Sequence, residues 1–214
     1  MQSFALSRRQ LLVGGAALGT ASPAIAQDLL AVLERSTPGQ QLGPFYPLVR
    51  PLDQDADLTR LAGSRGTASG EVIDIFGTVF DHDGRPIPGA KLDLWQANAM
   101  GRYMHAGDMR EDLPLDPHFQ GSAKLVADRQ GRYRFRTVRP GIYAFGGVPR
   151  PRHIHFDISS RRARLTTQMY FPGEKENELE KIKEGSLLVA RTAKPLRQDK
   201  LIAALQWDIK LPFG

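Results

Sequence analysis

Cysteine is absent from this chain of 214 residues, which excludes disulfide bonds and thiolate metal sites. Any bound metal ion must therefore be held by nitrogen and oxygen ligands. A strong charge of one sign is also lacking, since 29 Lys and Arg residues oppose 23 Asp and Glu residues. The basic residues are scattered and form no RNA- or DNA-binding motif, so no nucleic-acid partner is expected. We interpret the densest basic cluster, residues 161–164, as a solvated turn between strands.

Long apolar runs are missing too. The N-terminal run from Val13 to Leu18 is well short of the roughly 20 residues that a membrane-spanning helix needs. It follows the pair Arg8 and Arg9 and precedes Ala-Ile-Ala at 24–26, which resembles a cleavage site. The arrangement predicts a twin-arginine export signal over residues 1–26 and a periplasmic protein, with an ordinary secretory signal or an N-terminal anchor as alternatives.

Cleavage after residue 26 removes two arginines and no acid, which lowers the net charge from +6 to +4. This modest excess suits a soluble protein that attracts small anions. We expect no stable membrane association of the mature chain.

Fifteen prolines and 21 glycines are spread through the chain, which indicates many turns and short strands. An N-terminal arm is expected over residues 27–71, with one short amphipathic helix at 28–36. From residue 72 several segments alternate apolar and polar residues, as strands do. Strands are predicted at 72–80, 90–95, 123–127, 131–138, 153–159, 165–171, 187–191 and 205–211, and a short exposed helix at 175–183. The expected fold class is all-β, an antiparallel β-sandwich over residues 72–214.

Two of the five histidines, His153 and His155, lie one residue apart in segment 150–156, which reads Arg-Pro-Arg-His-Ile-His-Phe. On a strand, residues i and i+2 point to the same face, so the two imidazoles start about 7 Å apart on one side of a sheet. Such a pair can hold one metal ion. Taken alone it is weak evidence, because many similar pairs are surface residues or satisfied core groups.

Two of the five tyrosines are further candidates. Tyr103 lies in a glycine-led loop after the strand that ends at Trp95, and Tyr143 lies at a turn after a strand. Loops on a rigid sandwich are where sites are built, although both tyrosines can instead be half-buried plugs whose hydroxyls bond the backbone. Two phenolates and two imidazoles form a hard, anionic ligand set that suits ferric iron better than copper(I) or structural zinc.

Several motifs between about Thr37 and Phe171 resemble those of the intradiol ring-cleavage dioxygenases. Residues 101–103 and 133–143 are similar to the segments that give this family its two tyrosine ligands, and residues 150–156 match its arginine and its two histidine ligands. The other matching segments are 43–47 (Gly-Pro-Phe-Tyr-Pro), 83–90 (Asp-Gly-Arg-Pro-Ile-Pro-Gly-Ala), 94–98 (Leu-Trp-Gln-Ala-Asn) and 167–171 (Thr-Gln-Met-Tyr-Phe).

The resemblance implies a mononuclear non-haem Fe(III) whose ligands are Tyr103, Tyr143, His153 and His155. It implies an enzyme that inserts both atoms of O2 into a catechol-type aromatic and yields a muconate-type diacid. Tyr143 would then take up a substrate proton as it leaves the iron. The resemblance also allows a homo-oligomer.

Two further residues are catalytic candidates on the same ground. Arg150 would stabilise negative charge that builds up beside the ring, and Gln168 would hydrogen-bond an oxygen of the substrate or of O2. The alternatives are a surface salt bridge for Arg150 and a cross-strand polar pair for Gln168.

Within the family, segment 113–119 (Leu-Pro-Leu-Asp-Pro-His-Phe) resembles the protocatechuate class closely. Two departures fall at the expected pocket wall, namely a short stretch between Tyr143 and His153 and the replacement of a small residue by Arg152. They leave catechol and hydroxyquinol open as substrates, and a non-catalytic β-sandwich module is the other alternative. His105 and His118 are expected to be loop residues, and the sequence does not fix whether either touches the pocket.

Overall fold

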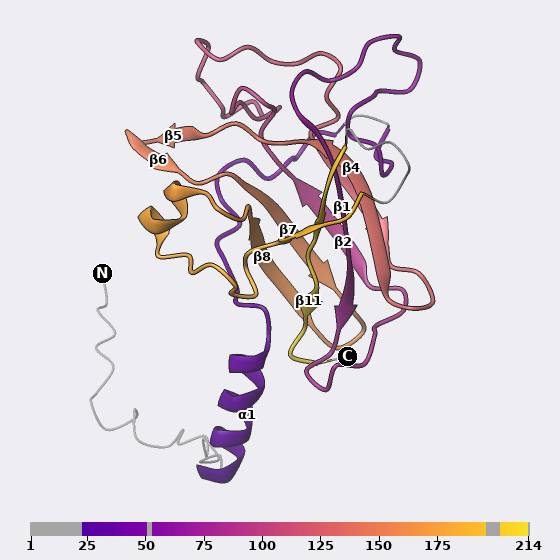
Figure 1. The fold of residues 1–214 in the computed structure, drawn as a ribbon, viewed down its shortest axis with the longest axis vertical. Helices are drawn as coiled ribbons and strands as arrows, with labels where there is room; N and C mark the ends of the chain where they lie inside the picture. Colours follow the sequence, from indigo (N-terminus) through magenta and orange to yellow (C-terminus); the bar gives the residue numbers. More distant parts are fainter. Residues whose placement is uncertain (1–22, 51–52, 196–201, 214) are drawn as a thin grey trace, which may run out of the picture.

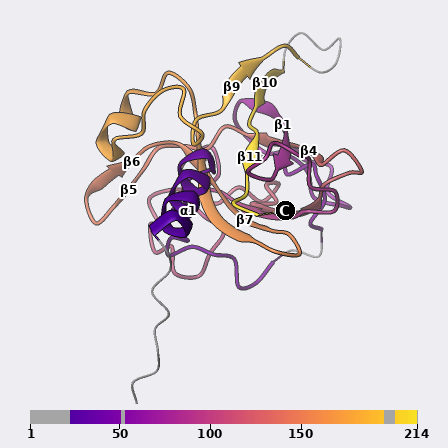
Figure 2. The same ribbon diagram turned by 90° about the horizontal axis from the view of Figure 1, so that it is seen from below.

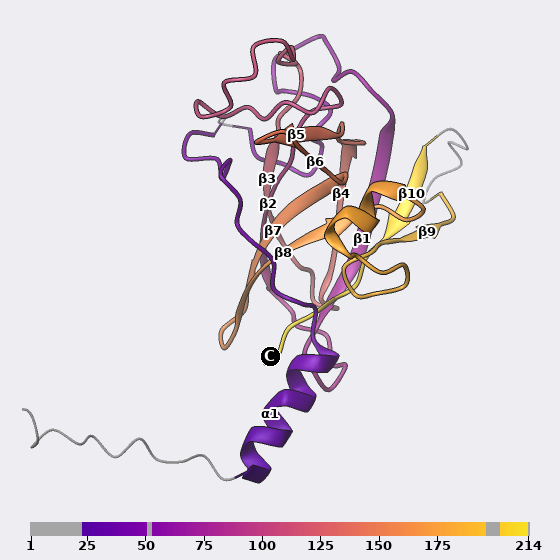
Figure 3. The same ribbon diagram turned by 90° about the vertical axis from the view of Figure 1, so that its left-hand side faces the viewer.

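The computed structural model describes residues 23–50, 53–195 and 202–213, and two β-sheets form its centre (Figure 1). One sheet contains β1 (Val72–Phe80), β4 (Arg132–Val138), β9 (Arg191–Ala193), β10 (Ala203–Gln206) and β11 (Ile209–Lys210). The other contains β2 (Lys91–Trp95), β3 (Ser122–Val126), β7 (His153–Ser159) and β8 (Arg164–Tyr170), in the order β3-β2-β7-β8. Figure 3 views the two layers from the side.

Alternate residues of the facing strands build the core between the sheets. Ile73 and Ile75 from β1 pack in one cluster with Ile154 and Phe156 from β7, and all four are almost fully buried. Since side chains alternate along a strand, the histidines of β7 point to the opposite, outer face of their sheet. That outer face carries the candidate site.

The predicted all-β sandwich is confirmed, but the first sheet is mixed rather than antiparallel. β10 and β11 both run parallel to β1, with Ile73 opposite Ala203 and Val79 opposite Ile209. Alternation along a strand carries no information about the direction of its neighbour. The sequence therefore could not show that these two strands run parallel to β1.

Three predicted elements of the C-terminal part differ clearly from the structure. The predicted strand at 187–191 is wrong, because residues 187 and 188 form a turn, Val189 makes one isolated bridge to Tyr170, and β9 begins only at Arg191. The predicted last strand is divided into β10 and β11. The predicted helix at 175–183 is a shorter 3-10 helix, η1 (Lys175–Glu180).

A hairpin that the sequence reading missed joins β5 (Tyr143–Phe145) to β6 (Val148–Arg150). Its turn is Gly146-Gly147, and both glycines have positive φ, 59° and 79°. A two-residue turn with two such angles is favoured between antiparallel strands and suits glycine. The hairpin forms a small sheet of its own, in which Tyr143 lies opposite Arg150.

The N-terminal helix α1 (Pro23–Arg35) begins before the predicted residue 28 and projects from one end of the sandwich (Figures 1 and 2). Most of the predicted export signal lies outside the described residues, and residues 23–26 fall in the first turn of α1. No helix in the described part of the chain is long and apolar enough to cross a membrane. In the predicted N-terminal arm beyond α1, Leu58 is fully buried in the core and its backbone N–H donates to the Arg136 carbonyl at 2.9 Å. This part of the arm therefore packs against the sandwich.

Candidate metal centre

His153 and His155 lie side by side on the outer face of the β2–β7–β8 sheet. Both are buried, with 2% and 3% of their surface exposed, and their Nε2 atoms are 3.1 Å apart. His155 is flanked in register by Trp95 on β2 and Gln168 on β8. The Trp95 ring stacks on the His155 ring at 5.0 Å with an angle of 3° between the planes, which fixes the imidazole orientation.

Burial holds both imidazoles neutral, and a hydrogen bond sets the tautomer of His153. His153 Nδ1 lies 2.6 Å from the Pro151 carbonyl and must donate to it, so the Nε2 atom carries the lone pair. Burial, together with the Arg150 charge, lowers the pKa of His153 to about 4 against the opposing effect of the Pro151 carbonyl. Burial, the neighbouring His153 and the Arg150 charge lower the pKa of His155 well below its usual value. The Gln41 carbonyl lies near the His155 ring, although its geometry falls short of a regular hydrogen bond to Nδ1.

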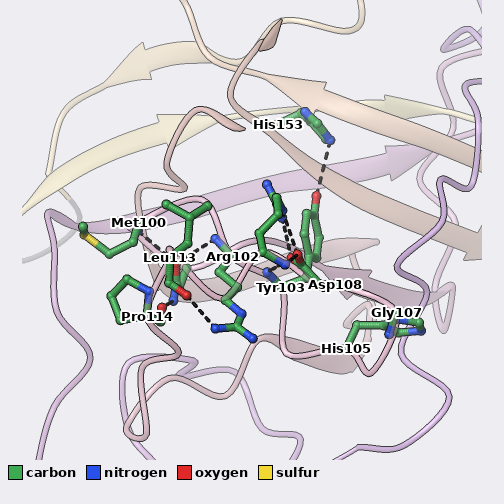
Figure 4. A network of polar contacts seen from close by, with 11 residues as sticks. Met100, Arg102, Tyr103, His105, Gly107, Asp108, Leu113, Pro114 and His153 are labelled. Atoms are coloured by element: carbon green, nitrogen blue, oxygen red, sulfur yellow. Dashed lines mark hydrogen bonds and ion pairs between the residues drawn. The ribbon is translucent and has the colours of Figure 1, made fainter. Parts of the chain in front are cut away.

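Tyr103 reaches this pair from the loop between β2 and β3. Its hydroxyl is 3.4 Å from His153 Nε2 (Figure 4). The loop is held by the buried Asp108 carboxylate, which accepts the Tyr103 backbone N–H at 2.8 Å and is paired with Arg110. Burial raises the pKa of Tyr103 well above its usual value, and proximity to Tyr143 adds to this.

Tyr143 opens β5 and completes the group. Its ring lies 5.5 Å from the Tyr103 ring and 5.7 Å from the His153 ring. Burial raises the pKa of Tyr143, whereas a hydrogen bond from Tyr103 and the charges of Arg150 and Arg110 oppose that rise. The Arg110 guanidinium lies over the Tyr143 ring, 4.7 Å from its centroid.

Two glycines allow the tyrosine-bearing segments to meet. A Cβ on Gly141 would lie 2.4 Å from the Gly101 backbone nitrogen, and a Cβ on Gly101, where φ is +88°, would lie 2.6 Å from the Ile142 carbonyl. The Gly141 N–H donates to the Asn98 carbonyl at 2.9 Å. Backbone contact this close requires glycine on both sides, and it sets Tyr103 beside Tyr143.

The four side chains fit a ferric ion as a donor set. His153 offers a neutral nitrogen with its lone pair free, His155 faces it, and two phenol oxygens lie beside them. Within the described ranges, histidine and carboxylate groups do not gather in sets of three or more, so the centre depends on its tyrosines. Burial disfavours the phenolate form of both tyrosines. A bound cation would favour that form, and hard nitrogen and oxygen donors of this kind suit a strong Lewis acid such as Fe(III). The structure brings together the four side chains named as ligands from the sequence, and their binding of iron stays a prediction.

Arg150 and Gln168 lie beside the four candidate ligands. Arg150, at the end of β6, forms an ion pair with Glu180 of η1, and its side chain keeps 23% of its surface exposed. Gln168 is buried; its Nε2 donates to the Gln41 carbonyl at 2.8 Å and its Oε1 lies 2.9 Å from the Tyr170 hydroxyl. The salt bridge considered as the alternative for Arg150 is therefore present, whereas Gln168 contacts the N-terminal arm and a residue of its own strand rather than a cross-strand partner.

The other residues singled out in the sequence lie outside the group of four candidate ligands. Arg152 turns to Glu174, at 3.3 Å, and to the Pro140 carbonyl, also at 3.3 Å. His118 lies 3.0 Å from the Ser64 hydroxyl on an exposed loop. His105 accepts the Gly107 N–H within its own loop, and its ring lies 5.8 Å from that of Phe45, which itself packs on Tyr103. Arg161 and Arg162 occupy the exposed turn between β7 and β8, as predicted, whereas Arg164 of the same cluster is the first residue of β8.

Four residues of the site were missed by the sequence reading: Asp108, Arg110, Tyr170 and Glu180. Tyr170 had a signal, because it shares a strand face with Gln168. The other three carry ordinary charges on irregular or short segments, and no spacing rule links them to the tyrosines or histidines.

Comparison with known proteins identifies the family. A sequence model of the family described as Dioxygenase matches residues 42–212. The protocatechuate 3,4-dioxygenase beta chain of Burkholderia cepacia is 42% identical over 175 residues, which cover 78% of this chain and 70% of that protein. The chain belongs to the intradiol ring-cleavage dioxygenases.

Other curated relatives of this intradiol dioxygenase are longer. The catechol 1,2-dioxygenase of Acinetobacter baylyi is 30% identical, with 70% of this chain and 50% of that protein covered. The hydroxyquinol 1,2-dioxygenase of Corynebacterium glutamicum is 30% identical, with 80% and 58% covered. The chain thus spans about half the length of these two relatives. Membership makes the protein an enzyme that acts on aromatic rings, and the alternative of a non-catalytic module is set aside.

Solved structures show the same fold. The dioxygenase domain of a dioxygenase and carbohydrate-binding fusion protein from Streptomyces sp. SirexAA-E superposes with a TM-score of 0.63 at 27% identity, covering 84% of this chain and 99% of that one. A 3-chlorocatechol 1,2-dioxygenase from Rhodococcus opacus has a TM-score of 0.67 at 22% identity, with 87% and 76% covered. At 22% identity, the similarity to the Rhodococcus opacus enzyme concerns the fold alone.

Proposed function

We propose that this intradiol dioxygenase inserts both atoms of O2 into a protocatechuate-like catechol and opens the ring between the two hydroxyls to a muconate-type diacid. The observation that carries the proposal is the convergence of two neutral imidazoles and two phenols, from three separate segments, into one buried group. A β-sandwich has no structural need for such a group.

Ferric iron held by Tyr103, Tyr143, His153 and His155 would supply Lewis acidity toward a catecholate and make the ring reactive toward O2. The chain supplies the proton and charge chemistry around it. The Tyr143 phenolate oxygen takes a proton from a substrate hydroxyl, so no separate histidine base is needed. Arg150 places a guanidinium next to Tyr143, where it stabilises negative charge on the ring; a fixed donor of this kind is worth about 3–4 kcal/mol.

The substrate class is proposed from the relative of 42% identity in Burkholderia cepacia, which is named for protocatechuate. The alternative is catechol or hydroxyquinol on the same site, as the names of other relatives indicate. Oxygen uptake with protocatechuate, catechol and hydroxyquinol separates these substrates. A semialdehyde product, which arises from cleavage outside the hydroxyl pair, would contradict the proposed reaction.

The ligand set is tested by colour. Charge transfer from phenolate to ferric iron should make the pure protein reddish-brown, and Tyr143→Phe should change the colour and slow substrate binding. Tyr133→Phe is the matched control, since Tyr133 is another buried tyrosine whose hydroxyl bonds the Trp207 carbonyl far from the site. If Tyr143→Phe leaves colour and binding like those of Tyr133→Phe, then Tyr143 is not a ligand.

We also propose that residues 1–26 direct export to the periplasm by the twin-arginine route, with the folded sandwich carrying its iron. The paired Arg8 and Arg9 and the Ala-Ile-Ala segment at 24–26 support this. Replacing both arginines by lysine should retain the precursor in the cytoplasm. Export of iron-free precursor through the general secretory route would refute the proposal.

A further inference from the structure

Glu180 joins the two candidate catalytic side chains although it lies outside both sheets. One carboxylate oxygen, Oε1, forms the ion pair with Nε of Arg150. The other, Oε2, lies 2.8 Å from the Tyr170 hydroxyl, and that hydroxyl lies 2.9 Å from Oε1 of Gln168. A single carboxylate thus contacts Arg150 directly and reaches Gln168 through one hydroxyl.

The backbone around Glu180 is held firmly. Glu180 is the last residue of η1, and the next residue, Lys181, has φ of 57°, the only positive φ of a non-glycine residue in the described part of the chain. Such a backbone angle persists when its surroundings enforce it. The buried Asn177 of η1 donates to the Phe171 carbonyl at 2.9 Å, which ties η1 to the end of β8. Glu180 is therefore presented to Arg150 by a fixed segment.

The direction of the hydrogen bond from the Tyr170 hydroxyl follows from the number of hydrogens available. The Tyr170 hydroxyl has one hydrogen but faces two acceptors, Oε1 of Gln168 and Oε2 of Glu180. The Gln168 amide cannot be reversed, because its nitrogen donates to the Gln41 carbonyl. A carboxylate paired with arginine is the stronger acceptor, so Tyr170 donates to Glu180. Oε1 of Gln168 then retains a buried lone pair for a hydroxyl donated by a bound ligand.

We propose that Glu180 is a positioning residue that fixes the Arg150 guanidinium and, through Tyr170, the Gln168 amide for ring cleavage, and that its charge moderates the attraction of Arg150 for an anionic catechol. The proposal rests on the proposed function, because Arg150 and Gln168 matter only if the site binds a catechol. It goes beyond that function by assigning a role to a residue of η1.

Glu180→Gln is the decisive variant. Loss of the carboxylate leaves Arg150 mobile but with its full charge available to the substrate. We expect kcat to fall roughly tenfold, less than the ~100-fold or more for removal of an oriented donor itself, because Arg150 remains; KM should stay level or decrease. The dissociation constant for protocatechuate, measured without oxygen from the change in visible absorption, should likewise stay level or decrease. Glu180→Asp keeps the charge and should recover part of kcat.

The matched control is Glu178→Gln, on the same short helix, because Glu178 is exposed. It should match the wild type in kcat, KM and melting temperature. Tyr170→Phe, which keeps the Arg150–Glu180 pair and cuts the link to Gln168, should lower kcat less than Glu180→Gln does; it also serves as the test variant if Glu180→Gln does not fold.

The outcomes separate the two proposals. Wild-type protein that cleaves none of the three catechols overturns the proposed function. Active wild type with Glu180→Gln equal to Glu178→Gln in kcat and KM overturns the role of Glu180. So does a Glu180→Gln variant in which kcat, protocatechuate affinity and melting temperature fall together, since that pattern indicates a purely structural contact.

Discussion

Arg110 is the residue through which the protein acts on both candidate tyrosine ligands at once. Its guanidinium covers the Tyr143 ring, and its partner Asp108 accepts the backbone N–H of Tyr103. A cation over an aromatic face is worth about 0.5–2 kcal/mol, more when water is excluded. Here it also favours the phenolate form, because the Arg110 charge lowers the pKa of Tyr143 against the effect of burial.

Replacing Arg110 by Gln should shift the visible absorption band of the iron-loaded protein to longer wavelength. Without the cation the phenolate electrons lie higher in energy, so their transfer to iron requires less energy; at about 0.5–2 kcal/mol the shift is small. Absorption spectroscopy of the variant and of Arg65→Gln, which removes an exposed arginine, measures it. An unchanged band in Arg110→Gln would show that Arg110 does not tune Tyr143.

The sequence predicted which side chains lie together where they are close along one strand or belong to a family motif. Strand alternation placed His153 and His155 on one face, and the family motifs added Tyr103 and Tyr143. Glu180 was beyond reach because it lies 30 residues from Arg150 along the chain and meets it only through the path of η1. Charges on short irregular segments carry no periodicity, so their partners emerge only from the fold.

Among the elements, the pairing of β1 with β4 contains a buried charge on the sheet face opposite the core. Asp74 of β1 has 3% of its side chain exposed and lies opposite Arg136 of β4, with which it forms hydrogen bonds of 2.9 and 3.0 Å. Burial alone would raise the pKa of Asp74. The hydrogen bonds and charges of Arg136 and Arg134 outweigh it and lower that pKa below the ordinary 3.8.

Asp74→Asn should therefore lower the free energy of unfolding at pH 7 by about 1–3 kcal/mol. Because the folded pKa is depressed, the contribution of Asp74 is full above the ordinary carboxyl pKa of 3.8 and is lost as pH falls through the folded pKa. Urea unfolding at pH 7 and at pH 3 should thus show a smaller difference between wild type and variant at pH 3. The exposed pair of Asp83 and Arg85 provides the control Asp83→Asn, with little effect at either pH. A difference that grows toward pH 3 would contradict the ion-pair account.

The prediction of secondary structure from the sequence failed for short strands and for irregular segments. β5 and β6 have three residues each, too few for alternation to stand out, yet they carry Tyr143 and Arg150. The apolar residues Leu188 and Val189 resemble a strand by composition, but they pack against Tyr170 in a small cluster of their own. Long, regular strands such as β1, β4 and β7 were predicted within about one residue of their observed bounds.

At the scale of the whole molecule, the candidate centre brings together the loop after β2, the β5–β6 hairpin and β7. A metal ion bound there acts as a cross-link of the native state. Ligands that bind only the folded protein stabilise it by mass action, by about 2.7 kcal/mol when their free concentration is one hundred times the dissociation constant.

Removing iron with a chelator should therefore abolish the colour and lower the melting temperature, and adding ferric iron back should restore both. The Tyr143→Phe variant should lose less melting temperature on chelation than the wild type, because one of its cross-links is already gone. Tyr133→Phe is less stable from the outset, since it loses the hydrogen bond to the Trp207 carbonyl, but its loss on chelation should equal that of the wild type. Equal melting temperatures of the iron-loaded and iron-free wild type would show that the four residues do not hold a metal ion that supports the fold.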